Sequence, residues 1–391
     1  MLPFSMFLAL QPRLQDEWTL SNTESGWISS AYFAGYMLAV PVLSSLTDRI
    51  DARTVWLGAC AMTTLGAMGF ALWADGVWTA AAFQMLAGAG LAGTYMPGLK
   101  VIADRLPHIP RPRHVAFYTT SFTAGSSLSF AIVGALGSHL SWRTAILVTA
   151  TGPVAAWLLV VTRLGPVPVM AADHVTHGSH WRSVFSSADT MRYVVGYSAH
   201  AWELFALRAW IVPFVTFCAA SLSSPPVTAA TIAALVALVG IPASMAGAEA
   251  TSRVERRRLI VLVMVLSVAA SLLVLPSSLM SWSFVIAAVV LYSAFISADS
   301  AALTSGILHV APHASRGTAM AVYSTLGFAA ASAGTFAVGA LLDVMGGQSL
   351  ASWALAFSLM SAPNLLGAWA IAHTRDGARG SGLGTRDSVR G

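Results

Sequence analysis

The sequence predicts an all-α membrane protein made of two related halves. Its composition, the length of its apolar stretches and an internal repeat support this prediction. Of the 391 residues, 56% are hydrophobic and only 9% are charged, and the mean hydropathy is +0.71. A soluble domain carries roughly 25% charged residues. This chain has too little polar surface for water, so we expect the lipid bilayer to be its solvent.

Eleven apolar stretches are long enough to cross a bilayer, which takes about 20 helical residues. Broken at charge clusters and at Pro, Gly and Ser turns, they are 26–46, 54–74, 78–102, 115–137, 143–163, 191–218, 226–248, 259–276, 282–308, 317–342 and 350–372. Residues 1–10 are apolar but too short to cross. We therefore expect transmembrane bundles at 1–163 and 191–372, a linker at 164–190 and a disordered tail at 373–391.

The two bundles repeat the same signals about 205 residues apart. Tyr118 and Tyr323 each lie sixteen positions before a Gly-Ala-Leu triplet, which begins at Gly134 in one bundle and Gly339 in the other. Homologous membrane halves of this kind are typical of transporters. By the same offset the first helix should mirror the span at 191–218, and only residues 1–10 remain for it. We expect a truncated first helix, and either a natural start upstream of Met1 or an impaired form.

Arginine residues are concentrated in alternate loops, and this placement predicts the orientation. They are Arg49 and Arg53, then Arg105, Arg111 and Arg113, then Arg182, then Arg253 with Arg256, Arg257 and Arg258, and finally Arg316. Loops rich in Arg and Lys stay on the cytoplasmic side of a membrane. We therefore expect an inner-membrane protein whose linker and C-terminus face the cytoplasm. The sequence pI of 9.6 reflects these loops and not a nucleic-acid-binding face. We expect a monomer in the lipid bilayer.

The loop at 44–53 reads Ser-Ser-Leu-Thr-Asp-Arg-Ile-Asp-Ala-Arg. It resembles the loop signature of the major facilitator superfamily, a Gly, three residues and then Asp-Arg-x-Gly-Arg-Arg. Ser44, Asp51 and Ala52 depart from that signature. The resemblance implies two pseudo-symmetric six-helix bundles around a central cavity, with alternating access by rocking of the bundles.

The resemblance also implies a conformational latch at the cytoplasmic face. Its members would be Asp48, Arg49, Arg53, Arg253 and Arg257. The alternative interpretation of Asp48 and Arg49 is a helix cap together with an orientation charge. Two other signatures of the family are incomplete: Gln84 stands where the fourth helix normally has Arg, and no Pro follows the glycines of the fifth helix. The direction of transport therefore stays open.

Ionisable groups at bilayer depth are candidate functional groups because a charge is costly in lipid. The span at 191–218 holds His200, Glu203 and Arg208. Glu203 and Arg208 are about 140° apart on a helix, too far for an easy pair, so each should find a partner elsewhere. Glu203 is a candidate carrier of a coupling proton. Arg208 is a candidate ligand for an anionic substrate group. The alternative is that both form structural pairs between helices.

The remaining candidates for the substrate and proton site are aromatic or acidic. Trp202 and Trp210 would line the cavity or face lipid, Tyr197 lies on the same span, and Asp299 lies deep in the span at 282–308. The linker carries histidines at 174, 177 and 180, which form either a solvated, pH-sensitive segment or a transition-metal site.

These observations predict a secondary active transporter of a small organic solute, coupled to protons or to an exchanged solute. The alternatives are a transporter-like assembly or sensing protein and a metal-ion exporter. The chain has neither a His-Glu-x-x-His nor a Gly-x-Ser-x-Gly arrangement, so we expect no enzyme activity. We also expect no cofactor, no bound metal and no nucleic-acid partner.

Overall fold

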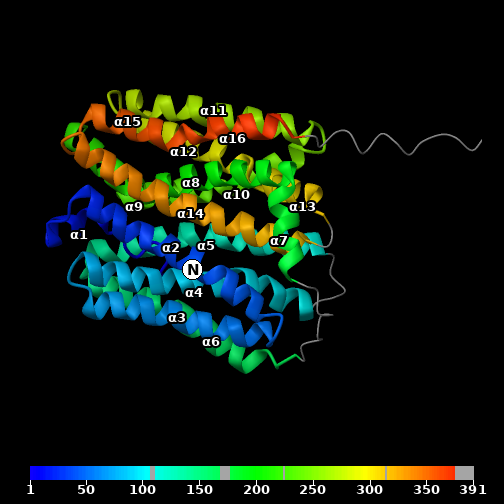
Figure 1. Cartoon of the computed structure of the whole chain (residues 1–391). Helices are drawn as coiled ribbons and strands as arrows, with labels where there is room; N and C mark the ends of the chain where they lie inside the picture. The colour runs from blue at the N-terminus through cyan, green and yellow to red at the C-terminus, as the bar shows by residue number, and fades with distance from the viewer. Residues whose placement is uncertain (106–110, 168–176, 223–224, 313–314, 375–391) are drawn as a thin grey trace, which may run out of the picture.

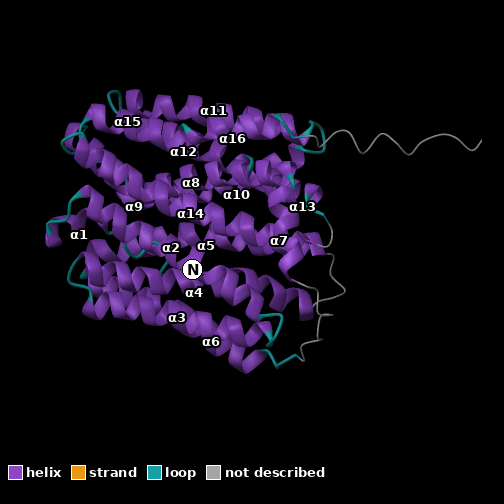
Figure 2. Ribbon diagram, viewed as in Figure 1, coloured by secondary structure: helices purple, strands orange, loops and turns teal. Residues whose placement is uncertain are grey.

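The structure is a computed structural model that describes residues 1–105, 111–167, 177–222, 225–312 and 315–374. All regular secondary structure in these ranges is helical (Figure 2), so the all-α prediction is confirmed. Within the described residues, nine helical spans are long and apolar enough to cross a membrane. The helices run side by side between two ends of the bundle (Figure 1). We call the end where α6 stops and α8 starts the linker end, and the other the opposite end.

The first half contains six helices, followed by a short helix in the linker. Their bounds are α1 Gln11–Trp18, α2 Asn22–Leu46, α3 Ala52–Trp73, α4 Val77–Arg105, α5 Arg111–His139, α6 Trp142–Arg163 and the linker helix α7 His177–Ser186. Several start at side chains that accept hydrogen bonds from the first turn, as Ser21 does for α2 and Ser141 for α6. The sequence therefore encodes these helix starts locally.

The second half contains nine helices that account for six predicted spans. Their bounds are α8 Ala188–Ser221, α9 Ala229–Leu238, α10 Gly240–Ala250, α11 Arg256–Ser277, α12 Trp282–Ala298, α13 Ser300–Val310, α14 Arg316–Val344, α15 Leu350–Ser361 and α16 Pro363–Ala372. Three predicted spans are each divided in two, at Val239, Asp299 and Ala362. Pro363 explains the last division because proline has no N–H to continue the helical hydrogen bonds, while Ala362 before it keeps helical dihedral angles. Each of the eleven predicted spans coincides with a helix or a pair of helices.

The two halves meet along two pairs of helices, α2 with α14 and α5 with α9. The repeated glycines lie in these contacts. A Cβ on Gly134 of α5 would come within 2.1 Å of the Ala230 Cβ, and one on Gly339 of α14 within 2.3 Å of the Asn22 carbonyl oxygen. Small residues let helix backbones approach closely in membranes. The repeat found in the sequence is thus also a repeat in space.

Residues 1–10 form tight turns inside the first half. The backbone N–H of Ser5 donates to the Ser129 Oγ at 2.9 Å, and the side chains of Phe4 and Phe7 are buried. Met1 packs against Gly125 in the middle of α5, and Figure 1 places the N-terminus midway along the bundle. The described segment before α1 is therefore covered by protein.

Candidate functional site

Glu203 lies in the middle of α8 and is enclosed by side chains of three other helices. The Tyr292 hydroxyl of α12 donates to Oε1 at 2.9 Å, and the Ser267 hydroxyl of α11 is 3.1 Å from Oε2. The Asn364 amide of α16 donates to Oε2 and also to the Ser267 Oγ at 2.9 Å. Glu203 has no exposed surface. Its partners are neutral, so among the described residues Glu203 joins four helices without pairing with Arg208 or His200.

His200 and Asp299 form a second buried polar contact, closer to the linker end. His200 Nδ1 lies 2.8 Å from Asp299 Oδ1, and both side chains are 2% exposed. Ser300 Oγ is 3.2 Å from His200 Nε2. Asp299 occupies the point where α12 ends and α13 begins. Two ionisable side chains therefore lie against each other at membrane depth.

Tyr197 connects this pair to α14, the helix that also contacts the first half. Its ring stacks on Tyr323 with 3.8 Å between the centroids, and it lies 5.8 Å from the His200 ring. The Tyr323 hydroxyl is 3.3 Å from Thr304 Oγ1 of α13. The predicted residues Tyr197, His200 and Asp299 are thus brought together in one cluster.

Arg208 is a buried cation on the same helix. It is 5% exposed, and its guanidinium lies over the Phe205 ring at 5.6 Å from the centroid. Its Nη1 atom is buried without a hydrogen-bond partner, and the described residues place no carboxylate within ion-pair distance of it. A guanidinium keeps its charge in proteins. A buried charge without a partner is strongly unfavourable, so this site favours an anion.

Arg208 lies beside an aromatic seam formed by both halves. The seam consists of Phe33 and Tyr36 of α2, Phe205 of α8 and Phe328 of α14. The ring centroids of Phe33 and Phe205 are 4.6 Å apart, and Tyr36 stacks on Phe328 at 3.7 Å. Rings of this kind provide large apolar faces with defined geometry. The buried cation therefore sits next to the contact between the bundles.

The two predicted tryptophans pack within the second half. Trp202 donates its indole N–H to the Leu359 carbonyl at 3.0 Å, and Trp210 donates to the Thr335 carbonyl at 2.9 Å. Trp210 is 1% exposed. The Trp202 indole therefore joins α8 to α15, and the Trp210 indole joins α8 to α14.

The five latch residues are separate from one another in this structure. Asp48 and Arg49 are exposed and have no ion pair among the described residues. Arg53 donates to the Val161 carbonyl at 3.3 Å. Arg253 lies 3.8 Å from Glu249, and Arg257 lies 3.0 Å from Glu255. The latch implied by the family resemblance stays a prediction for another conformation. The linker histidines lie outside the residues whose side chains are described.

Asp51, a departure from the family signature, is the centre of a polar network at the linker end. Its carboxylate accepts from the backbone N–H groups of Arg53 and Val167, both at 2.9 Å, and lies 3.5 Å from the Arg105 guanidinium. Burial alone raises the pKa of Asp51, but these two hydrogen bonds and the Arg105 charge outweigh it and lower the pKa below its ordinary value. Asp51 thereby ties the α2–α3 loop to the end of α4 and the start of the linker.

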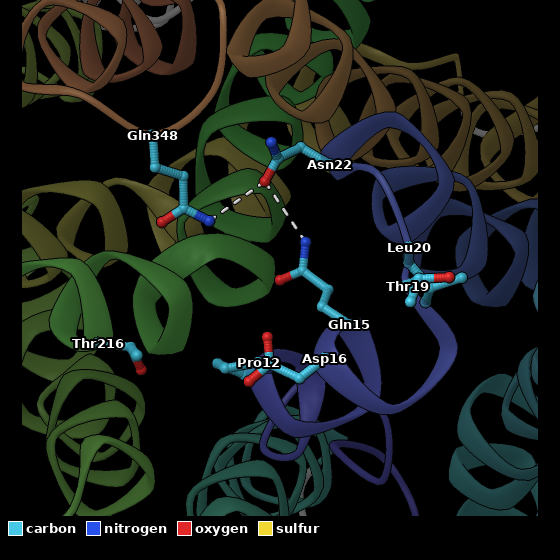
Figure 3. Close-up of a pocket in the computed structure, with 8 residues that line it drawn as sticks. All are labelled: Pro12, Gln15, Asp16, Thr19, Leu20, Asn22, Thr216 and Gln348. Carbon is cyan, nitrogen blue, oxygen red and sulfur yellow. Dashed lines mark hydrogen bonds between the residues drawn. The ribbon is translucent and has the colours of Figure 1, made fainter.

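A cavity of about 480 Å³ lies at the opposite end, and both halves contribute to its walls. Figure 3 shows Asn22 between two glutamines: Gln15 Nε2 donates to Asn22 Oδ1 at 3.4 Å and Gln348 Nε2 donates to it at 3.2 Å. Asp16 and Thr216 also line the cavity. This cavity therefore lies next to the start of α2, and Asn22 is part of its wall.

Sequence reasoning missed the partners of Glu203 and the role of Asp51. Ser267, Tyr292 and Asn364 lie 64, 89 and 161 residues from Glu203 along the chain. The only local signal is the amide of Asn364, a polar group inside an apolar span. In the sequence Asp51 stands out only as a departure from a motif.

Comparison with known proteins places the chain among membrane transporters. Residues 1–220 match the Major Facilitator Superfamily. The probable sphingolipid transporter spinster homolog 1 of Arabidopsis thaliana is 27% identical over 137 residues, which are 35% of this chain and 28% of that protein. The phosphoglycerate transporter protein of Salmonella typhimurium is 29% identical over 166 residues, which are 41% of this chain and 35% of that protein. The matches span about a third of the length of these curated relatives.

A solved structure with a similar fold covers nearly the whole chain. It is the inward-facing, unoccupied crystal structure of a bacterial homologue of the human lysosomal transporter Spinster. It has a TM-score of 0.73 and 14% sequence identity, and the match covers 95% of this chain and 92% of that one. At this identity the similarity shows the fold alone.

Proposed function

This chain belongs to the Major Facilitator Superfamily, and we propose that it is a secondary active transporter that moves a small organic anion across a membrane by alternating access, coupled to protons. The observation that carries the proposal is the buried Arg208 guanidinium, which has an unpartnered Nη1 and lies beside the aromatic seam between the halves. A solute that bridges the two halves must bind where they meet. Arg208 supplies the charge for an anionic group, and the rings supply an apolar surface.

The anionic class is supported by chemistry and by one relative. A guanidinium presents donors in a planar fork that suits carboxylate and phosphate groups. The Salmonella relative is named for phosphoglycerate, an organic anion. The Arabidopsis relative is named for sphingolipids, so the relatives do not agree on one substrate.

We assign proton coupling to His200 and Asp299. An imidazole and a carboxylate lie 2.8 Å apart inside the second half, and imidazoles serve as proton shuttles in many proteins. Tyr197 links the pair to Tyr323 on α14, so a change in protonation can act on a helix of the contact between the halves. Glu203, in contrast, is held by neutral donors from three helices, and we assign it a structural role.

The proposed topology has an N-terminal bundle at 1–163, a cytoplasmic linker at 164–190, a C-terminal bundle at 191–372 and a cytoplasmic tail at 373–391. The arginines of the loops at the linker end support a cytoplasmic position for that end. We propose a monomer in the inner membrane. Reporter fusions after Gly165 and Gly377 should both give a cytoplasmic signal, and a periplasmic signal from either would overturn the topology.

Ligand binding to purified protein tests the anion site. A thermal-shift panel of carboxylates and phosphorylated carboxylates, with 3-phosphoglycerate among them, should contain at least one compound that stabilises the protein. Arg208→Gln should weaken binding of that compound by roughly 10-fold to 100-fold, because a charge-assisted contact is lost. Arg163→Gln, at an exposed arginine at the end of α6, is the matched control and should bind normally.

Uptake of the same compound into proteoliposomes then tests transport. A pH gradient should drive accumulation by the unmodified protein, and Arg208→Gln should abolish it. The proposal fails if the stabilising compounds are neutral or if Arg208→Gln binds the anion as tightly as the unmodified protein does.

A further inference from the structure

We infer that Asp343 of α14 and the first residues of α2 form a gate that holds the two halves together at the opposite end. The Asp343 carboxylate accepts from the backbone N–H groups of Asn22 at 3.1 Å and Thr23 at 2.7 Å. It also accepts from the Asn22 side-chain amide at 2.8 Å. These residues are more than 300 positions apart in the chain and belong to different halves. A carboxylate at a helix N-terminus satisfies unpaired N–H groups and the positive end of the helix dipole.

Further contacts join α2 to α14 on the side of the gate that faces the linker end. The Ser332 hydroxyl donates to the Ser30 carbonyl at 3.0 Å, and Ser30 lies about two helical turns after Asn22 on α2. A Cβ on Gly26 would come within 3.2 Å of the Phe336 carbonyl oxygen. Ser30 is only 3% exposed. The contact between α2 and α14 is therefore closed to solvent from the gate to the aromatic seam.

The contacts between halves are unequal at the two ends. Helix α5 packs along α9, which lies toward the opposite end, and barely touches α10, which leads to the linker end. Asp48 and Arg49 at the linker end are exposed and unpaired among the described residues. Among the described residues, the Asp343 contact is thus the charged connection between the halves in this conformation, and separation of the halves at this end requires it to break.

The polar cavity gives access to the gate from outside the bundle. Its walls include Gln15 of the first half and Gln348 after α14, and both donate to the Asn22 side chain that also bonds Asp343 (Figure 3). A solute or water in this cavity competes for the same amide. The gate therefore borders a cavity at the opposite end, the end where the two halves have to separate for the gate to open.

Removal of Asp343 should loosen the gate without unfolding α2. The helix has its own capping box, in which the Ser21 side chain accepts from the Glu24 N–H and the Glu24 side chain accepts from the Ser21 N–H. Loss of the external carboxylate therefore leaves the start of α2 capped. This separation of effects makes Asp343→Asn a test of the gate and not of helix stability.

The test measures the reactivity of a single cysteine at Ser30. The two native cysteines, both buried, are first replaced by alanine. Ser30→Cys is then labelled with a membrane-impermeant maleimide in intact cells and in inside-out vesicles. We expect slow labelling in the parent and roughly 10-fold faster labelling in Asp343→Asn, because bonds to a charged group are lost. Asn22→Ala, which keeps the two backbone bonds, should give a smaller increase.

Asp75→Asn is the matched control. Asp75 is at the same end, but its carboxylate accepts from Thr79 within the first half at 2.8 Å, so this variant should label at the parent rate. Faster labelling of Asp343→Asn in either preparation supports the gate, and the preparation that responds identifies the side it faces. An unchanged rate in Asp343→Asn and Asn22→Ala, or an equal increase in Asp75→Asn, overturns it. The readout needs no substrate, so the outcome is independent of the anion-binding test.

Discussion

Substitutions of Glu203 should show whether its carboxylate has a structural role or couples transport to protons. In Glu203→Ala the Tyr292 hydroxyl loses the one hydrogen-bond partner that it has among the described residues, whereas Ser267 keeps the Met264 carbonyl and Asn364 keeps the Ser267 hydroxyl. One stranded buried donor costs about 1–3 kcal/mol, and the vacated volume adds to this cost. We expect a loss of about 2–4 kcal/mol in the free energy of unfolding.

Glu203→Gln should be much milder. The glutamine carbonyl can still accept from Tyr292, and the hydroxyls and amide around it can reorient. Side-chain hydrogen bonds in membrane bundles contribute on average about 0.6 kcal/mol, so we expect a loss of about 1 kcal/mol. The exposed Glu249→Gln is the control and should change stability by less than about 0.5 kcal/mol.

Unfolding in mixed micelles with increasing denaturing detergent measures these differences. A double-mutant cycle adds Tyr292→Phe, which should cost little once Glu203 is alanine, because the hydroxyl is already without its acceptor. Equal losses for Glu203→Ala and Glu203→Gln, or a fully additive Tyr292→Phe, would refute the structural reasoning. A stable Glu203→Gln that loses pH-driven uptake would instead return the coupling role to Glu203.

Three other variants address separate parts of the molecule. Asp299→Asn should fold and bind the anion but lose at least about tenfold in pH-driven accumulation, measured in proteoliposomes against exchange without a gradient. Gly339→Leu should force α14 away from the start of α2 and speed maleimide labelling of Ser30→Cys, whereas Gly58→Leu, at a glycine with open space around it, should not. Asp51→Asn should cost about 1 kcal/mol at neutral pH. Because the pKa of Asp51 is lowered by folding, its contribution is present above its ordinary value of 3.8 and is lost as the pH falls below it, so thermal unfolding between pH 5 and pH 3 should depend less on pH in the variant.

Glycine spacing shows how far sequence reasoning reached into the contacts. The repeat of Gly134 and Gly339 is visible in the sequence. The structure adds the partners, Ala230 on α9 and Asn22 on α2. A glycine in a membrane helix predicts that something approaches closely, but not which helix does so.

The sequence by itself determined the class of the protein, the positions of its eleven apolar spans and its family. These features follow from local properties: the length of apolar runs, caps and prolines at their ends, and a loop motif read in order. The ionisable groups of α8 were also found in this way, because any charge inside an apolar span is conspicuous.

Only the tertiary structure decided what those groups touch. The sequence predicts only that Glu203 finds a partner elsewhere, and in the structure it contacts three neutral side chains from α11, α12 and α16. In the sequence Asp343 is one acid just after an apolar span, and only the structure places its carboxylate at the start of α2. Such contacts depend on the rotation and lateral order of helices that are distant in the chain. Hydrophobic periodicity leaves both undetermined when helices are apolar on every side.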